Sequence, residues 1–170
     1  MNTPTVKEIA QQSSLAARQL SSTPESQRNL ALAKMADSLE SVKSQVLDCN
    51  AQEVDQARLA GQSAAMVKRL TIDDKVFDYM LSRLRKVAQR PDPLNRVLEG
   101  HTNPAGLQVF KKSVPLGVIG IIYESRPNVT TDAAGVCIKS GNAVILRGGS
   151  EALQTNTLLT DAMIKGAVEA

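Results

Sequence analysis

The sequence predicts an α/β fold in which a helical N-terminal region and a β-hairpin lead into one β-α-β unit. Residues 118–122 and 143–146 are short, apolar and rich in β-branched side chains, as strands of a parallel sheet buried on both faces are. Between them, small and apolar residues recur every three or four positions, which is typical of a crossover helix. This stripe consists of Val129, Ala133, Val136 and Ser140.

The first ninety residues are helical by pattern, because their apolar residues follow helical spacing. Thr23 before Pro24 predicts one helix start, and Thr71 with Asp74 predicts a capping box at another. Gly61 is a helix stop signal. The expected helical segments are residues 6–20, 23–46, 53–60 and 71–89.

A boundary follows at Arg90-Pro-Asp-Pro93, since each proline restricts the residue before it and cannot donate to a continuing helix. Residues 96–99 and 107–113 then predict two strands around the turn-rich segment GHTNPAG. We expect this hairpin to be an arm that pairs with another sheet. The chain is therefore divided into a helical part (1–90), the hairpin (91–114) and the start of a nucleotide-binding unit (115–170).

Composition excludes several classes of protein. The 170 residues carry a net charge of +3, which implies no polyanionic partner, and an aromatic content of 2% leaves little to stack on nucleic-acid bases. The N-terminus has no signal-peptide pattern, and no apolar run reaches the roughly 18 residues of a membrane span. We expect a soluble cytoplasmic protein without a membrane or nucleic-acid partner.

The cysteines and the single histidine offer no obvious chemistry. Cys49 and Cys137 lie in unrelated segments without CxxC spacing, so neither a zinc site nor a disulfide is expected. Cys137 lies within an apolar helix and is expected to pack as a small buried hydrophobe. His101 is expected in the hairpin turn without a second ligand, so no metal site is predicted.

A phosphate-binding loop is the first candidate site. The GxGxxG and GxxxxGK[ST] fingerprints are both absent. However, Arg147-Gly-Gly-Ser150 follows the second strand at its carboxyl end, where open parallel sheets bind ligands. Two glycines allow close backbone approach to a phosphate, and the flanking side chains are donors. The alternative interpretation is a flexible turn before the next helix.

The loop after the first strand, Tyr123-Glu-Ser-Arg-Pro-Asn-Val-Thr130, leaves the same edge of the sheet and is unusually polar. Arg126 is suited to pair with a phosphate or a carboxylate, and Asn128 or Thr130 is expected to cap the crossover helix and direct backbone amides at an anion. The alternative is that Asn128 only caps and Arg126 only covers surface.

These segments resemble a known family. The runs VPLGVIGIIYESRPNVT and GNAVILRGGSEA are similar to the γ-glutamyl phosphate reductases, also called glutamate-5-semialdehyde dehydrogenases, of the aldehyde dehydrogenase superfamily. The segment DCNAQEVDQARLAG and the approach to the hairpin resemble the same family in the same order. The resemblance covers essentially the whole chain and implies a Rossmann-like domain of the aldehyde dehydrogenase type.

The resemblance implies an activity. Members reduce L-glutamate 5-phosphate with NADPH to L-glutamate 5-semialdehyde and phosphate in proline biosynthesis, and no metal takes part. A cysteine displaces phosphate to give a thioester, and hydride from the cofactor releases the aldehyde. Arg126 and Asn128 are implied as substrate or oxyanion residues. The implied cofactor-binding residues are Tyr123, Glu124, Ser125, Arg147, Gly148, Gly149 and Ser150.

The chain departs from the family in length. Members are more than twice as long, and their catalytic cysteine belongs to a later domain. Neither Cys49 nor Cys137 matches its motif, so no catalytic residue is expected in this chain. Two interpretations stay open: an N-terminal fragment of the reductase, favoured because residues 151–170 stop without a terminal cap, or a free-standing truncated module for nucleotide binding or assembly.

Partners are also implied by the resemblance. They are L-glutamate 5-phosphate as substrate, glutamate 5-kinase as a pathway partner, and further copies of the chain joined through the hairpin arm.

Overall fold

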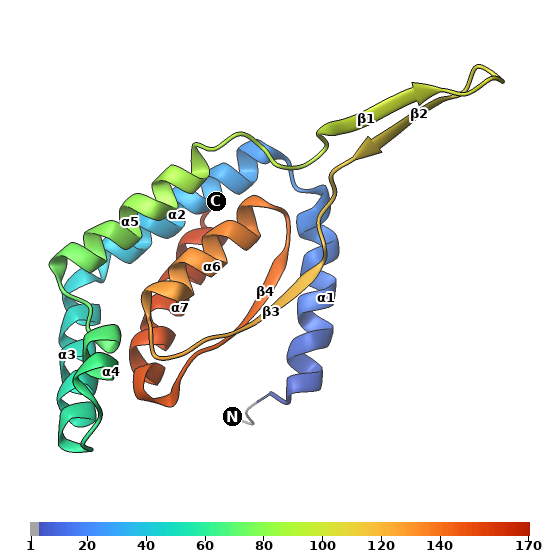
Figure 1. The fold of residues 1–170 in the computed structure, drawn as a ribbon. Coiled ribbons are helices and arrows are strands. Elements are labelled where there is room, and N and C mark those ends of the chain that lie inside the picture. The colour runs from blue at the N-terminus through green and yellow to red at the C-terminus, as the bar shows by residue number, and fades with distance from the viewer. Residues whose placement is uncertain (1–3) are drawn as a thin grey trace.

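The computed structural model describes residues 4–170 and has the predicted α/β class (Figure 1). The N-terminal helices are α1 (Val6–Ser22), α2 (Glu25–Ser41), α3 (Lys43–Leu59), α4 (Ala64–Leu70) and α5 (Asp74–Ala88). The hairpin consists of β1 (Val97–Thr102) and β2 (Gln108–Lys112). The remaining elements are β3 (Val118–Ile122), α6 (Asn128–Lys139), β4 (Ala143–Arg147), a short 3-10 turn (Ser150–Ala152) and α7 (Leu153–Val168).

One hydrophobic core joins the N-terminal helices to the β-α-β unit. Helix α2 packs against α5 and α7, and α6 packs against α5 and β4. Leu32, Phe77 and Leu159, from three of these helices, are fully buried. Helices α2 and α7 approach so closely that a Cβ atom on Gly166 would meet the backbone of Lys34. Residues from both ends of the chain are therefore needed to complete the core.

Two predicted helix caps are wrong in the same way. Thr23 and Thr71 each close the helix before them, because their hydroxyls donate to the carbonyls of Gln19 and Val67, four residues back. Helix α2 begins without a side-chain cap, and Asp73 caps α5. The helix that Thr71 closes, α4, was not predicted, and α3 is longer than its predicted segment.

The two predicted strands form a parallel pair, from Val118 beside Ala143 to Ile122 beside Arg147, connected by α6. The expectation that they are buried on both faces is wrong for this chain. Residues of β3 alternate between exposed and half-buried, and Ile122 is 83% exposed. The reason is that, within residues 4–170, the sheet consists of these two strands, and most of its packing is against α1 and α6.

The crossover helix turns a different face to the core from the one predicted. Val136, a member of the predicted stripe, is 54% exposed, whereas Ala134 and Cys137 are buried. Gly135 explains this orientation: a Cβ atom there would lie 2.9 Å from the side chain of Leu84 in α5, so the helices meet on that face.

The hairpin projects away from the rest of the chain (Figure 1). Strands β1 and β2 are antiparallel, and every residue in them is exposed. His101 lies in β1 opposite Val109, not in the turn as predicted, because β1 runs on to Thr102.

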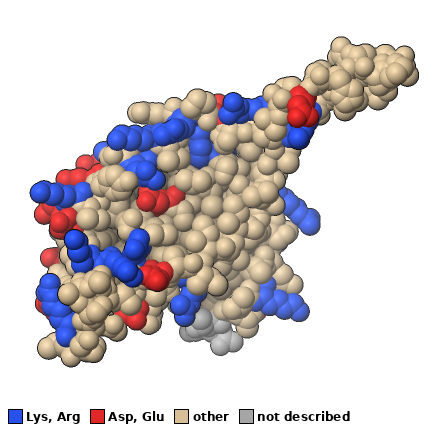
Figure 2. All heavy atoms as spheres, viewed as in Figure 1, with Lys and Arg blue, Asp and Glu red and all other residues tan. Residues whose placement is uncertain are grey.

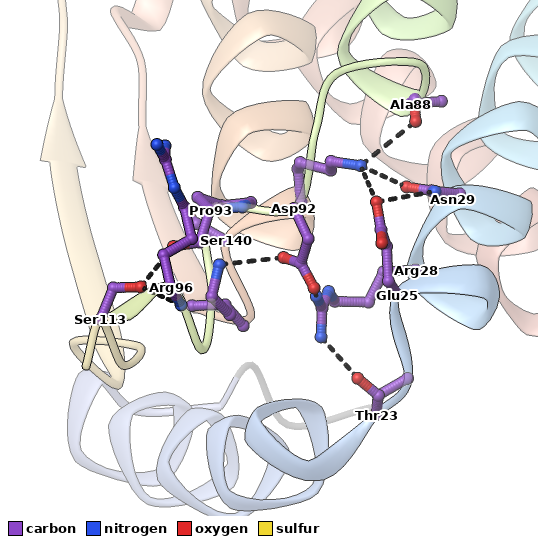
Figure 3. A network of polar contacts seen from close by, with 12 residues as sticks. Thr23, Glu25, Arg28, Asn29, Ala88, Asp92, Pro93, Arg96, Ser113 and Ser140 are labelled. Atoms are coloured by element: carbon purple, nitrogen blue, oxygen red, sulfur yellow. Dashed lines mark hydrogen bonds and ion pairs between the residues drawn. The ribbon is translucent and has the colours of Figure 1, made fainter. Parts of the chain in front are cut away.

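A polar network holds the base of the hairpin (Figure 3). The Ser113 hydroxyl donates to the Pro93 carbonyl at 2.6 Å and accepts from the Arg96 amide at 3.1 Å. Nearby, the buried Arg28 of α2 pairs with Asp92 at 2.6 Å. These contacts fix where the arm leaves the core, although its length is exposed.

Candidate functional site

The loops that follow β3 and β4 meet at the carboxyl end of the sheet. The Tyr123 amide donates to the Arg147 carbonyl at 3.1 Å, which extends the parallel ladder by one bond beyond Ile122. The structure thus brings the two candidate loops together at the edge where parallel sheets bind ligands.

A relay of side chains ties the first loop to α6 and α7. The hydroxyl oxygens of Tyr123 and Thr130 are 2.6 Å apart, and Thr130 donates to the Asn156 side chain at 2.9 Å. Because Thr130 has one hydroxyl proton and gives it to Asn156, Tyr123 is the donor in the first bond. Burial raises the pKa of Tyr123, which keeps its phenol protonated for this role. Tyr123 therefore fixes the loop.

A second bond joins the two loops directly. Ser125 is 2% exposed, and its hydroxyl donates to a Glu151 carboxylate oxygen at 2.7 Å. This hydrogen bond is the main reason that the pKa of Glu151 lies below its ordinary range. Ser125 is thus a buried partner of Glu151.

The glycine pair serves loop packing. A Cβ atom on Gly148 would lie 2.5 Å from the Asn156 side chain and 3.1 Å from the Tyr123 hydroxyl. On Gly149 it would collide with the Ser125 hydroxyl. A side chain at either position would displace these neighbouring groups, so the two glycines let the second loop pack closely against the first.

Arg147 and Ser150 are the exposed members of the second loop. Arg147 closes β4, and Ser150 opens the 3-10 turn that leads into α7. Among the predicted residues of this loop, their side chains are the ones available to a ligand in solution.

The N-terminal amides of α7 already bind a carboxylate from within the chain. The buried Glu53 of α3 accepts from the amides of Gln154 and Thr155 at 2.7 and 3.2 Å, and also from the Thr155 hydroxyl. Asn50, one turn earlier, donates to Thr155 and accepts from the Ile72 amide at 2.6 Å. An intramolecular anion therefore occupies the position where a helix N-terminus would hold a phosphate.

The remaining predicted residues of the first loop face α4. Glu124 pairs with Arg69 at 2.8 Å, so its side chain does not join the bonds between the two loops. Arg126 and Asn128 line a pocket between α4, α5 and the start of α6. Side chains therefore alternate along the loop, with Tyr123 and Ser125 turned to the second loop and Glu124 and Arg126 turned to α4.

The predicted caps of α6 are wrong. Asn128 is the first helical residue and Thr130 lies in the first turn, while Pro127 takes the N-cap position without a side-chain hydrogen bond. Proline is suited to this entry because its fixed φ matches the helix. The Asn128 side chain is thereby left at the pocket instead of on its own backbone.

Neither cysteine belongs to either loop. Cys137 is 3% exposed and burial raises the pKa of its thiol; burial also raises that of Cys49 on α3. Across residues 4–170, no three His, Cys, Asp or Glu side chains gather as metal ligands. No helix in that range is both long and apolar enough to cross a membrane.

Sequence reasoning missed two acidic residues of this region. Glu151 had a usable signal, because an acidic residue in the first turn after a loop favours the helix N-terminus. Glu53 had none, since its partner Gln154 is 101 positions away.

Comparison with known proteins gives a consistent picture. No protein-family model matches the chain. A γ-glutamyl phosphate reductase of a Thermoanaerobacter species is 45% identical over 160 residues, which cover 94% of this chain and 39% of the relative. The crystal structure of a Thermotoga maritima γ-glutamyl phosphate reductase superposes with a TM-score of 0.93 and 35% identity, covering 96% of this chain and 40% of the other.

The likeness extends to more distant structures at the level of the fold. An NAD-dependent benzaldehyde dehydrogenase from Corynebacterium glutamicum matches with a TM-score of 0.69 and 17% identity. The fold is therefore that of the N-terminal part of aldehyde dehydrogenases. The chain spans about two fifths of the length of the curated relatives it matches.

Proposed function

We propose that this chain, which has the sequence and fold of the N-terminal part of the γ-glutamyl phosphate reductases, supplies the cofactor-facing segment of such a reductase. The full enzyme would convert L-glutamate 5-phosphate to L-glutamate 5-semialdehyde and phosphate with NADPH in the cytoplasm. The observation that carries the proposal is the pair of interlocked loops at the carboxyl ends of β3 and β4. A preorganised edge of this kind suits a nucleotide.

The residues present fit a nicotinamide cofactor at this edge. Arg147 and Ser150 are exposed and offer a cation and a hydroxyl to phosphate or ribose oxygens. The amides of Gln154 and Thr155 at the start of α7 are not available for this purpose, because Glu53 accepts from them. We assign Tyr123, Ser125, Gly148 and Gly149 a supporting role, which is to hold the loop that carries Arg147 in position.

The cofactor would supply hydride to the acyl carbon. The chemistry also needs a cysteine thiolate that displaces phosphate, and we propose that this nucleophile lies outside the present sequence. Burial raises the pKa values of the Cys49 and Cys137 thiols, which disfavours the thiolate that a nucleophile requires. The present chain would bind and orient the reactants, with Arg126 and Asn128 on the substrate side of the loop.

Cofactor binding by the 170-residue chain tests this proposal. Titration calorimetry should detect NADPH, and Arg147→Ala should weaken binding by about tenfold, because a charge-assisted contact is lost. Lys86→Ala, an exposed cation on α5, is the matched control and should leave the dissociation constant unchanged. An Arg147→Ala chain that binds NADPH as tightly as the parent would refute the assignment.

A binding or assembly module without catalysis is the second candidate, favoured because the interlocked loops and the exposed hairpin occur together with two cysteines whose thiol pKa values are raised by burial. Both candidates predict no turnover by this chain. The two candidates predict different results for a longer protein, in which this chain is joined to the remaining three fifths of a relative. Rescue of a proline auxotroph supports the reductase, whereas nucleotide binding without rescue supports the module.

We also propose that the hairpin joins copies of the chain. Its apolar side chains are exposed on a projecting arm, including Phe110 at 54% and Leu98 at 56%. Sedimentation velocity should show concentration-dependent association that Phe110→Ser abolishes. A chain that stays monomeric at every concentration would contradict this role. Association with glutamate 5-kinase stays a prediction from the resemblance.

A further inference from the structure

A cationic pocket lies on the α4 side of the loop that follows β3. It has a volume of about 510 Å³ and is lined by residues of α4, α5 and the start of α6. Lys68, Arg69 and Arg126 supply three cationic groups to its lining, which contains no carboxylate. Figure 2 shows Lys and Arg gathered over α4 and toward the start of α6, with an acidic group beside them. The electrostatics of this pocket favour an anion.

The start of α6 adds to this preference. Helix N-termini attract negative charge, and no side chain caps α6. Asn128, its first residue, lines the pocket and offers an amide that can donate to an anionic oxygen. Tyr79 of α5 also lines the pocket.

The ion pair between Arg69 and Glu124, beside the pocket, can open so that each side chain binds a charged group of a ligand instead. Arg69 and Glu124 are 43% and 66% exposed, and ion pairs at such exposure contribute little to stability. A ligand with both a carboxylate and an ammonium group can replace this pair by two pairs, one with Arg69 and one with Glu124. The pocket and its rim thus combine three cations with one carboxylate, which complements a zwitterionic amino acid that carries a second anionic group.

The alternation of side chains along the loop separates this pocket from the edge where the second loop lies. Tyr123 and Ser125 bond toward α7 and Glu151, whereas Glu124 and Arg126 face α4. A hydride-transfer enzyme has to hold the substrate and the nicotinamide in separate sites that face each other across the path of the hydride. One short loop with alternating side chains can contact both.

We propose that this pocket recognises the charged ends of the amino-acid substrate: Lys68 and Arg126 bind its phosphate or carboxylate oxygens, and the Arg69–Glu124 pair binds its α-carboxylate and α-ammonium groups. The inference rests on the proposed function and deepens it. It reassigns Glu124 from the cofactor to the substrate and adds Lys68 and Arg69 of α4, which sequence reasoning did not single out.

Binding of small probes to the 170-residue chain tests the pocket. Inorganic phosphate, L-glutamate and glutarate, which lacks the amino group, are titrated separately at millimolar concentration and followed by NMR shifts. Arg126→Gln and Lys68→Gln should each weaken phosphate or L-glutamate about tenfold, because a charge-assisted hydrogen bond is lost. The probe that responds identifies which anionic group lies against these two cations. Shifts confined to other surfaces, or no shift with any probe, would overturn the proposal.

Glu124→Gln tests the ammonium contact. The parent chain should prefer L-glutamate to glutarate, and the variant should lose that preference while its affinity for phosphate is retained. The three substituted side chains are exposed, so unchanged melting temperatures are expected for Lys68→Gln, Glu124→Gln and Arg126→Gln. An unaltered preference in Glu124→Gln would remove Glu124 from the pocket.

NADPH binding separates failure of this inference from failure of the proposed function. Arg126→Gln and Lys68→Gln should leave the NADPH dissociation constant unchanged, and Arg147→Ala should leave probe binding unchanged. If NADPH binds but the probes do not, only the pocket assignment fails. If the pocket variants weaken NADPH instead of the probes, the pocket belongs to the cofactor and the inference is wrong.

Discussion

The helical core and the two-stranded sheet of this chain differ sharply in how completely they are covered. Leu32 of α2 and Phe77 of α5 are fully buried, while Ile122 of β3 and Leu116 just before it are 83% and 86% exposed. The helices bury their apolar faces against one another, whereas the sheet leaves apolar side chains in water. The stable part of this chain is therefore the helical layer, and the candidate site stands at the margin of the less covered part.

Truncating one apolar side chain in each region should give the largest difference in the free energy of unfolding. Leu32→Ala leaves a cavity in the core and should lower the free energy of unfolding by about 2–5 kcal/mol. Ile122→Ala removes a side chain that is 83% exposed, so the expected change is within about 0.5 kcal/mol. Urea unfolding of both variants measures the difference. A comparable loss in Ile122→Ala would mean that β3 is covered in solution.

The buried polar network around Asn50, between α3 and α7, should show the next largest effect on the free energy of unfolding. Asn50→Ala removes the bonds to the Leu70 carbonyl at 3.0 Å and to the Ile72 amide at 2.6 Å, and leaves both backbone groups buried without those partners. The expected loss is about 1–3 kcal/mol. Thr157→Ala is the control, because its exposed hydroxyl bonds only within its own helix. Equal unfolding curves for Asn50→Ala and the parent would show that water replaces these bonds.

The hydrogen bonds from Tyr123 through Thr130 to Asn156 should contribute less to the free energy of unfolding than the buried network around Asn50. Tyr123→Phe removes one hydrogen bond from a half-buried phenol and should cost about 0.5–1.5 kcal/mol. Tyr79→Phe is a matched control, since Tyr79 is 51% exposed. Both variants are compared by urea unfolding. If Tyr79→Phe proved the more destabilising, the relay through Thr130 would not hold the loop.

The sequence predicted features whose residues lie close together in the chain and missed those that depend on contacts between distant residues. The order of β3, α6 and β4 was readable because strand and helix periods lie within forty consecutive residues, and the loop positions followed from the strand ends. The face of α6 was not readable, because Val136 and Cys137 are both apolar and only packing against α5 selects between them. Contacts such as Arg69 with Glu124, 55 positions apart, leave no local pattern at all.

The smallest expected effect is a pH dependence of the bond between the two loops. The Ser125 hydroxyl is the main cause that lowers the pKa of Glu151 in the folded chain. A lowered carboxyl pKa stabilises the fold above the unfolded value of about 4.3, and this contribution is lost as the pH falls through the folded value. Unfolding free energies of the parent and Ser125→Ala, measured from pH 6 to pH 3, should therefore differ most at the upper end and converge at the lower.

The Glu151→Gln variant tests whether the pH dependence comes from Glu151 or from another acidic group. Glu8, whose pKa is also lowered by its bonds to Thr5, is unchanged in every variant, so its contribution cancels in the difference. With a neutral amide at position 151, Ser125→Ala should produce a difference that no longer changes with pH. A difference that still narrowed toward low pH in the Glu151→Gln background would place the titrating group elsewhere. The bond between the two loops would then not depend on the charge of Glu151.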